Sequence, residues 1–264
     1  MKLAINIVNA FSKGAFTGNP AAVIVTDTPL PESMMQSIAA QNNLAETAFV
    51  VTNCEPYPLR WFTPIKEVDL CGHATLAVAK VLFDQGVKKD LLRFSSLSGE
   101  LGVRKINSAL ELDFPARPAG LNTDADKVSI ANAIGCKASA INECLIANWC
   151  VVVVECEQTV RQLQPDFAAI AELHPFALMV TAKGTDCDFV ARFFAPNAGI
   201  NEDPVTGSAY TTLAPYWAER LGKNTLSARQ LSTRGGWLEC DVGEKRVRIR
   251  CQVEPYLSGE IEIR

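Results

Sequence analysis

Three side chains that can exchange protons lie where predicted secondary-structure elements meet. Glu46 belongs to the segment NNLAET, between a helix-like and a strand-like stretch. His73 begins one apolar helical stretch, and Asp203 precedes a second. A histidine or carboxylate at such a junction can act as acid or base, or orient a substrate in a cleft. Each also has a structural explanation: a solvated glutamate, a locally bonded histidine, and an aspartate that stabilises a helix start.

Glycines open both helical stretches, Gly72 the first and Gly207 the second. The first N–H groups of a helix have no partner within it, and the helix dipole makes that end positive. A glycine there lets a ligand approach the backbone closely. Both helix starts are therefore candidates to bind a carboxylate or a developing enolate. Thr206 and Ser208 flank the second glycine, either as helix caps or as donors to such a group.

Cys71 precedes Gly72, and a thiolate at a helix N-terminus suits the base of a racemase. A two-base racemase needs a second base on the opposite face, but the half-chain spacing places Thr206 where the partner thiol should be, and no cysteine lies nearby. The nine cysteines form no CxxC pair, so we expect free buried thiols rather than disulfides or a zinc site. The two histidines, His73 and His174, are too few for a multi-histidine metal site, and we expect His174 to be structural.

The composition is that of an ordinary globular protein, with 48% hydrophobic residues and a net charge of −4 over 264 residues. This balance argues against nucleic-acid or anionic-membrane partners. No glycine-rich nucleotide-binding motif occurs, so no nucleotide cofactor is expected. The longest clean apolar run, Cys150–Val154, is too short to span a membrane, and the N-terminus lacks a signal-peptide pattern. We therefore expect a cytoplasmic protein.

Short strands and a few helices alternate along the chain. Val/Ile/Phe-rich segments bounded by turn residues predict strands at 22–26, 48–52, 92–94, 109–114, 151–156, 177–181 and 246–250. Apolar residues at helical spacing predict helices over 31–41, 71–85 and 206–221. Gly222 is a stop signal for the last of these helices.

Two segments of the sequence resemble each other. RWFTP at 60–64 leads to DLCGHA at 69–74, and RFFAP at 192–196 leads to DPVTGSA at 203–209. The R-aromatic-F-x-P blocks are offset by 132 residues, which is half the chain length. We interpret this as an internal duplication, with half-domains at 1–118 and 119–264 and the last strand able to return to the first half. A pseudo-two-fold axis would let both helix starts face one central cleft.

Five ordered motifs together resemble the phenazine-biosynthesis PhzF-like family. They run in order across roughly 200 of the 264 residues and are GNPAAV at 18–23, NNLAETAF at 42–49, RWFTP at 60–64, CGHAT at 71–75 and EDPVTGSA at 202–209. The resemblance implies the α+β diaminopimelate-epimerase fold, with two pseudo-symmetric halves that each curl a mixed β-sheet around a central helix. It also implies an active site between the halves, isomerase chemistry without cofactor or metal, and commonly a homodimer.

The resemblance also assigns roles to residues. Glu46 matches the family's proton-shuttling glutamate, His73 its cleft histidine and Asp203 its aspartate, so these three are the predicted catalytic residues. Asn19, Gly72, Gly207 and Ser208 are predicted to bind substrate. The sequence departs from the family at Tyr210, where relatives often have histidine, and at Cys251, where they often have glycine. Both departures are expected to alter pocket shape, which leaves the substrate open.

The leading hypothesis is a cofactor-independent isomerase that moves a proton on a small carboxylate metabolite by general acid/base catalysis in an interdomain cleft. Glu46 would be the acid/base, with His73 and Asp203 orienting the substrate or relaying protons. One alternative is an amino-acid racemase or epimerase that depends on Cys71. Another is a non-catalytic ligand-binding or interaction protein that has kept the fold.

Overall fold

The computed structural model describes residues 1–174 and 176–263 and divides the chain into two units. Unit 1 is Met1–Asp113 with Arg250–Arg264, and unit 2 is Phe114–Ile249. Each unit is a mixed β-sheet with its own long apolar helix, so the predicted α+β fold with two similar halves is confirmed. The C-terminal segment belongs to the same unit as the N-terminus.

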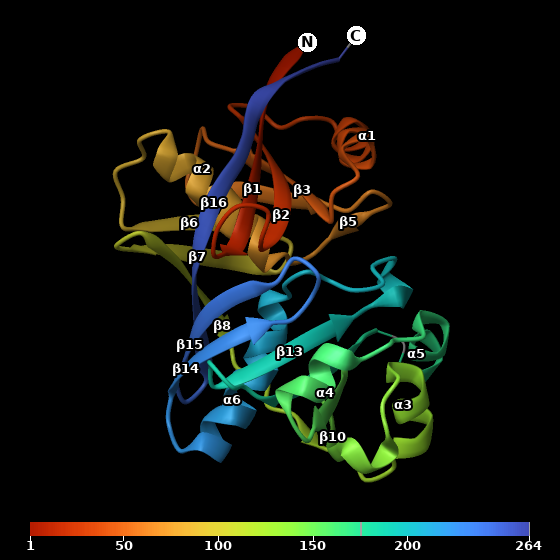
Figure 1. Ribbon diagram of the computed structural model, residues 1–264. Helices are drawn as coiled ribbons and strands as arrows, with labels where there is room; N and C mark the ends of the chain where they lie inside the picture. Colours follow the sequence, from red (N-terminus) through yellow and green to blue (C-terminus); the bar gives the residue numbers. More distant parts are fainter. Residues whose placement is uncertain (175, 264) are drawn as a thin grey trace. The chain divides into compact units, whose positions relative to one another are not determined.

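The strands of unit 1 form a closed ring. Their bounds are β1 (Lys2–Ser12), β2 (Asn19–Thr26), β3 (Glu46–Val51), β4 (Tyr57–Phe62), β5 (Glu67–Val68), β6 (Leu91–Ser96), β7 (Gly99–Ile106), β8 (Ala109–Pro115) and the long β16 (Arg246–Glu262). The order is β1-β2-β3-β4-β6-β7-β8-β16, and β16 also pairs with β1, which closes the ring. In Figure 1, β1 and β16 run side by side toward the two termini. The β2–β3 pair is parallel, which brings the first residues of both strands to one edge.

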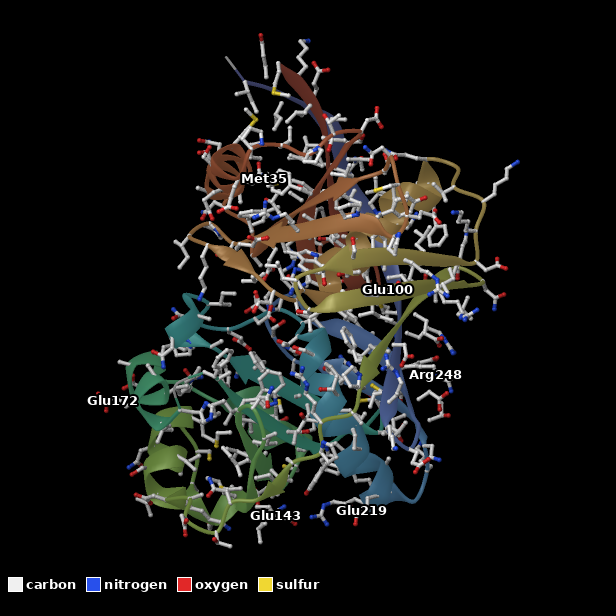
Figure 2. All side chains as sticks on the ribbon, turned by 180° about the vertical axis from the view of Figure 1, so that it is seen from behind. Met35, Glu100, Glu143, Glu172, Glu219 and Arg248 are labelled. Carbon is white, nitrogen blue, oxygen red and sulfur yellow. The ribbon has the colours of Figure 1, made fainter. Side chains whose placement is uncertain are left out.

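The helix α2 (Gly72–Asp84) lies against β1, β2 and β3 of this ring. Nearly every residue from His73 to Leu82 is buried, as expected for a helix that is apolar on all sides. The helix α1 (Glu32–Asn42) instead buries only one face, through Met35, Ile38 and Ala39. Figure 2 labels Met35 on this helix.

Unit 2 repeats the plan with different helices. Its strands are β9 (Gly120–Leu121), β10 (Ile141–Ile146), β11 (Cys150–Val154), β12 (Leu178–Lys183), β13 (Phe189–Phe194), β14 (Thr225–Gln230) and β15 (Gly236–Val242), in the order β15-β14-β13-β12-β11-β10-β9. Short helices α3 (Lys127–Ile134), α4 (Glu157–Gln162) and α5 (Phe167–Leu173) contribute to one apolar core with β10–β13. No helix within residues 1–174 and 176–263 is long and apolar enough to cross a membrane.

The second long helix begins with a tighter turn than predicted. Gly207–Ala209 forms a 3₁₀ turn, followed by α6 (Tyr210–Leu221), and Gly222 ends the helix in the left-handed conformation at φ 64°. The predicted stop at Gly222 is therefore confirmed. An ion pair from Arg220 to Glu143 ties the end of α6 to β10 at 2.5 Å, and Figure 2 labels Glu143 at this edge.

Each unit carries the same arginine clamp, which supports the inferred duplication. Arg60 on β4 makes two hydrogen bonds to Glu67, at 2.6 Å each, and its guanidinium lies 5.1 Å from the Phe62 ring centroid. Arg192 on β13 makes two to Glu202, at 2.7 and 2.9 Å, with its guanidinium 5.0 Å from the Phe194 ring. In both units the clamp fixes the loop that leads to the glycine-initiated helix.

We expect the second clamp to contribute more stability than the first. The Arg192 and Glu202 side chains are 11% and 17% exposed, against 35% and 20% for Arg60 and Glu67. Arg192→Met leaves a carboxylate with little access to water and should cost about 3 kcal/mol. Arg60→Met should cost about 1 kcal/mol, because solvent screens that pair better.

Urea unfolding of both variants measures this difference. Arg93→Met, which removes the exposed pair with Glu100, is the control and should change stability by less than about 0.5 kcal/mol. Equal losses for Arg60→Met and Arg192→Met would contradict the ranking by burial.

Candidate active site

A buried carboxylate and a buried imidazole meet in unit 1. Glu46 is the first residue of β3, and His73 is the second residue of α2. Their side chains approach to 3.0 Å between Oε2 and Nε2. The residues are 9% and 6% exposed, so the contact is largely shielded from water. The structure thus brings together two of the three predicted catalytic residues.

One carboxylate oxygen of Glu46 lacks a well-aligned hydrogen bond. Within residues 1–174 and 176–263, the buried Oε2 atom accepts no hydrogen bond of acceptable geometry, although Nε2 is only 3.0 Å away. The two observations agree if the imidazole lies off the line along which its N–H would donate. A buried oxygen without an aligned donor is costly for folding, and a catalytic role is one explanation for such an atom.

The opposite edge of the imidazole is also occupied. His73 Nδ1 lies 3.4 Å from Cys71 Sγ and 3.4 Å from Asn19 Nδ2. Asn19, a predicted substrate-binding residue, is fully buried and begins β2. The ring therefore stands between a carboxylate at one nitrogen and a thiol and an amide at the other.

Local backbone features set these positions. Gly18 precedes Asn19 at φ +79°, and a Cβ there would come within 2.3 Å of the Ala10 carbonyl oxygen, so only glycine fits. Asn43 ends α1 in the left-handed conformation, which turns the chain toward β3. The Asn42 side-chain amide then donates to Thr47 Oγ1 at 3.1 Å, next to Glu46. The NNLAET motif thus encodes a helix stop followed by a strand start.

The environment shifts the pKa of both groups beside Glu46. Burial alone lowers the pKa of His73, but the neighbouring Cys71 and Glu46 outweigh it and raise that pKa well above its ordinary value. Burial, followed by the charge of Glu46, raises the pKa of Cys71 to about 11. The sulfur is therefore a neutral thiol near pH 7, and the thiolate needed by the racemase alternative is disfavoured.

The same trio is the group best suited to hold a metal. Among residues 1–174 and 176–263, only Glu46, Cys71 and His73 place three His, Cys, Asp or Glu ligand atoms within 4.8 Å of one another. This donor set suits zinc better than magnesium or calcium. The Nε2 atom lies 4.0 Å from Sγ and 3.0 Å from Oε2.

The third predicted catalytic residue, Asp203, lies in unit 2. Its Oδ2 accepts a hydrogen bond of 2.5 Å from Thr206 Oγ1, and its backbone N–H donates to the Phe193 carbonyl oxygen at 3.0 Å. The predicted substrate-binding residues Gly207 and Ser208 follow in the 3₁₀ turn that precedes α6. Gly72, the fourth predicted substrate-binding residue, is the first residue of α2 in unit 1.

Three other residues singled out in the sequence are structural. Tyr210, expected to shape the pocket, is fully buried and packs against Phe189. Cys251 is buried, and burial raises the pKa of its thiol to about 12. The Nδ1 atom of His174 accepts hydrogen bonds from the N–H groups of Phe176 and Ala177, at 3.1 and 3.3 Å.

Gln230 is a residue of this region that the sequence did not indicate. Its side chain bonds to the backbone of the loop that carries Asp203. Nothing in its local sequence, Ala-Arg-Gln-Leu at the end of a strand, separates it from an ordinary polar residue.

Comparisons with known proteins agree on the family. The PhzC-PhzF family, described as phenazine biosynthesis-like protein, matches residues 8–255. An uncharacterized isomerase of Pseudomonas aeruginosa is 48% identical over 264 residues, covering all of both chains. A human phenazine biosynthesis-like domain-containing protein is 37% identical over 99% of each chain.

Solved structures give the same answer. A PhzF-family protein from Enterococcus faecalis has a TM-score of 0.95 at 45% identity, with complete coverage of both chains. A hydroxyproline epimerase from Agrobacterium vitis shares only the fold, with a TM-score of 0.62 at 9% identity over 98% of this chain and 92% of that one. The chain therefore belongs to the phenazine biosynthesis-like protein family and is an isomerase of the PhzF type.

Proposed function

We propose that this isomerase moves a proton on a small carboxylate-bearing metabolite, with Glu46 as the acid/base and without a cofactor. The observation that carries the proposal is the buried Glu46–His73 contact in which Oε2 accepts no aligned hydrogen bond. A carboxylate oxygen held in place but not saturated with donors can take a proton from carbon. General acid/base catalysis by one side chain contributes about 10²–10⁴-fold to a rate.

The proposed reaction has two proton transfers and no net redox change. The Glu46 carboxylate takes a proton from a carbon next to the substrate carboxylate, or along a conjugated system, and the electron pair of the C–H bond enters an enolate-type π system. The Glu46 carboxylic acid then returns the proton to another carbon of that system. Asp203 keeps its predicted catalytic role, and Asn19, Gly72, Gly207 and Ser208 keep their predicted roles in substrate binding.

His73 supports this cycle as a cation. Its raised pKa favours the doubly protonated ring, so that positive charge faces the Glu46 carboxylate. A fixed imidazolium stabilises negative charge that develops on the substrate as well as on the carboxylate. A homodimer in the cytoplasm remains a prediction of the sequence.

Proton NMR of the two histidines tests the charge assigned to His73. The chain has only two, and burial lowers the pKa of His174 while that of His73 is raised. As pH rises, His174 should therefore lose its proton first and His73 last. Glu46→Gln removes a neighbouring negative charge and should lower the pKa of His73 without moving that of His174. Loss of the His73 proton at or below the pH at which His174 titrates would contradict the assignment.

The same shift predicts how stability depends on pH. A group whose pKa is higher in the folded state stabilises the fold fully below its unfolded pKa, about 6.5 for histidine, and loses that contribution as pH rises through the folded value. Urea unfolding of the wild type should therefore show a stability loss at alkaline pH that His73→Gln lacks. Identical alkaline profiles for the two proteins would count against the coupling.

Cys71 is the specific rival, because its sulfur contacts the same imidazole. A Cys–His–Glu arrangement resembles an activated nucleophile or base. Against it stands the pKa of about 11, since burial keeps the sulfur protonated. We therefore assign Cys71 to the wall of the site.

Proton exchange from heavy water separates the two assignments. A panel of small cyclic and acyclic carboxylates is incubated with enzyme in heavy water, and deuterium at carbon is measured by mass spectrometry. Glu46→Gln keeps the shape of the side chain but cannot carry the proton, so exchange should fall by about 10²–10⁴-fold. Cys71→Ala should retain most exchange, and Cys150→Ala is the control for a buried cysteine elsewhere in the chain.

The outcomes are distinct. If Cys71→Ala shows no deuterium exchange while Glu46→Gln exchanges at a nearly normal rate, the thiol and not the carboxylate is the base. Exchange that persists in both variants would remove Glu46 and Cys71 alike from the chemistry.

A further inference from the structure

Gln230 lies at the end of β14 in unit 2 and is 1% exposed. Its side chain reaches the loop between β13 and the 3₁₀ turn at Gly207. That loop carries Asp203, and two residues of it bond to this one amide. A buried glutamine must satisfy both an oxygen and a nitrogen, which makes its partners informative.

The amide holds the loop by both of its atoms. Nε2 donates to the Asp203 carbonyl oxygen at 2.8 Å. Oε1 accepts from the Thr206 backbone N–H at 3.0 Å and from the Tyr210 hydroxyl at 3.4 Å. A side chain that donates on one side and accepts on the other spans residues 203–206 as a brace. Glutamate cannot replace it, because a carboxylate has no N–H to donate.

Other contacts leave the braced loop little freedom. Thr206 Oγ1 donates to Asp203 Oδ2 at 2.5 Å, which orients the carboxylate itself. Ser232 Oγ donates to the Pro204 carbonyl oxygen at 2.7 Å. Val205 packs so closely on Gly236 that a Cβ there would come within 2.1 Å of Val205 Cγ2. Both the Thr206–Asp203 hydrogen bond and Gln230 join the two ends of the segment, and Gln230 also ties them to β14.

The brace also shows which groups of this loop are already engaged. The Thr206 N–H is used by Gln230, and the Thr206 hydroxyl is used by Asp203. Thr206 therefore serves the loop, and the sequence-based option that it donates to a bound anion loses support. Gly207 and Ser208 remain the predicted binding residues of this helix start.

We propose that Gln230 is a positioning residue for the isomerase reaction. It touches no reacting atom; it fixes the Asp203 carboxylate and the start of the Gly207–Ala209 turn by bracing the segment between them. Tyr210 supports the brace from within the core, which gives this departure from the family a defined role. The inference rests on the proposed role of Asp203, while the brace itself can be tested in the ligand-free enzyme.

Amide hydrogen exchange at single-residue resolution tests the brace. Gln230→Met keeps the side-chain size but loses these hydrogen bonds, so the Thr206 amide, which donates to Gln230 Oε1, should exchange about tenfold faster. The Asp203 N–H donates to the Phe193 carbonyl oxygen instead, so its exchange reports only whether the loop loosens. Gln230→Glu keeps the acceptor for Thr206 and loses the donor to Asp203. It should therefore leave the Thr206 amide closer to wild-type protection than Gln230→Met does. Gln252→Glu, at an exposed glutamine on β16, is the matched control and should change neither.

Reference amides distinguish positioning from general stability. The Val152 and Val180 amides lie in the buried core of unit 2 and should keep wild-type exchange rates in every variant. If they accelerate as much as Thr206, or if the Thr206 amide stays protected in Gln230→Met, the proposal is overturned.

Coupling to Asp203 tests the functional half of the inference. Deuterium exchange is measured with whichever panel carboxylate exchanges fastest, in Gln230→Met, Asp203→Asn and the double variant. Positioning through Asp203 predicts that the double variant is no slower than Asp203→Asn alone, while independent effects would multiply. If the rate losses of the two single variants multiply in the double variant, the inference is overturned. If Asp203→Asn incorporates deuterium into the substrate at the wild-type rate, the proposed role of Asp203 is contradicted. The brace is then judged by amide exchange alone.

Discussion

The contact between Glu46 and His73 is the constraint around which unit 1 is built. Two ionisable groups that are shielded from water lose their hydration, and each is tolerated because the other supplies charge. The contact requires the start of β3 and the start of α2 to meet within 3.0 Å. The left-handed turn at Asn43, the glycine at 18 and the apolar character of α2 all serve that meeting. The Oε2 atom of Glu46 has no aligned donor, which costs folding free energy and leaves this oxygen available to accept a proton.

The corresponding positions of unit 2 lack this acid/base pair. Phe62 on β4 pairs with Thr47, and its counterpart Phe194 on β13 pairs with Leu178. The position before Thr47 is Glu46, and the position before Leu178 is Ala177, which carries no proton. His73 likewise corresponds to Ser208. Both units have kept the arginine clamp and the glycine-initiated helix, whereas only unit 1 has the acid/base pair.

The sequence predicted what local patterns encode. Helices at 31–41, 71–85 and 206–221 and most of the predicted strands follow from periodicity and turn residues, and the structure confirms them within a few residues. The strand predicted at 246–250 is too short, because β16 continues to Glu262. The short helices α3, α4 and α5 were not predicted, because segments of six to eight residues carry little periodicity. Motif resemblance predicted Glu46 and His73 as catalytic residues, together with Asp203, but the contact between the first two became visible only in the fold.

Two features of the sites lay beyond any local pattern. Cys71 stands at a helix N-terminus, where a lowered pKa is usual, yet its burial raises that pKa to about 11. Gln230 acquires its importance from partners 20 to 27 residues away along the chain. Burial and long-range partners are properties of the packed chain, so neither effect is visible in the spacing of residue types.

The central claim is that one buried group, Glu46, both removes and returns the proton. A single-turnover reaction in ordinary water, with substrate deuterated at the reacting carbon, tests it most directly. A single shielded carboxylate predicts that a measurable part of the deuterium reappears at the new position in the product, and that exchange with solvent builds up only over repeated turnovers. Complete loss of deuterium in the first turnover would contradict the claim, because it would require two separate bases or free access of water to the base.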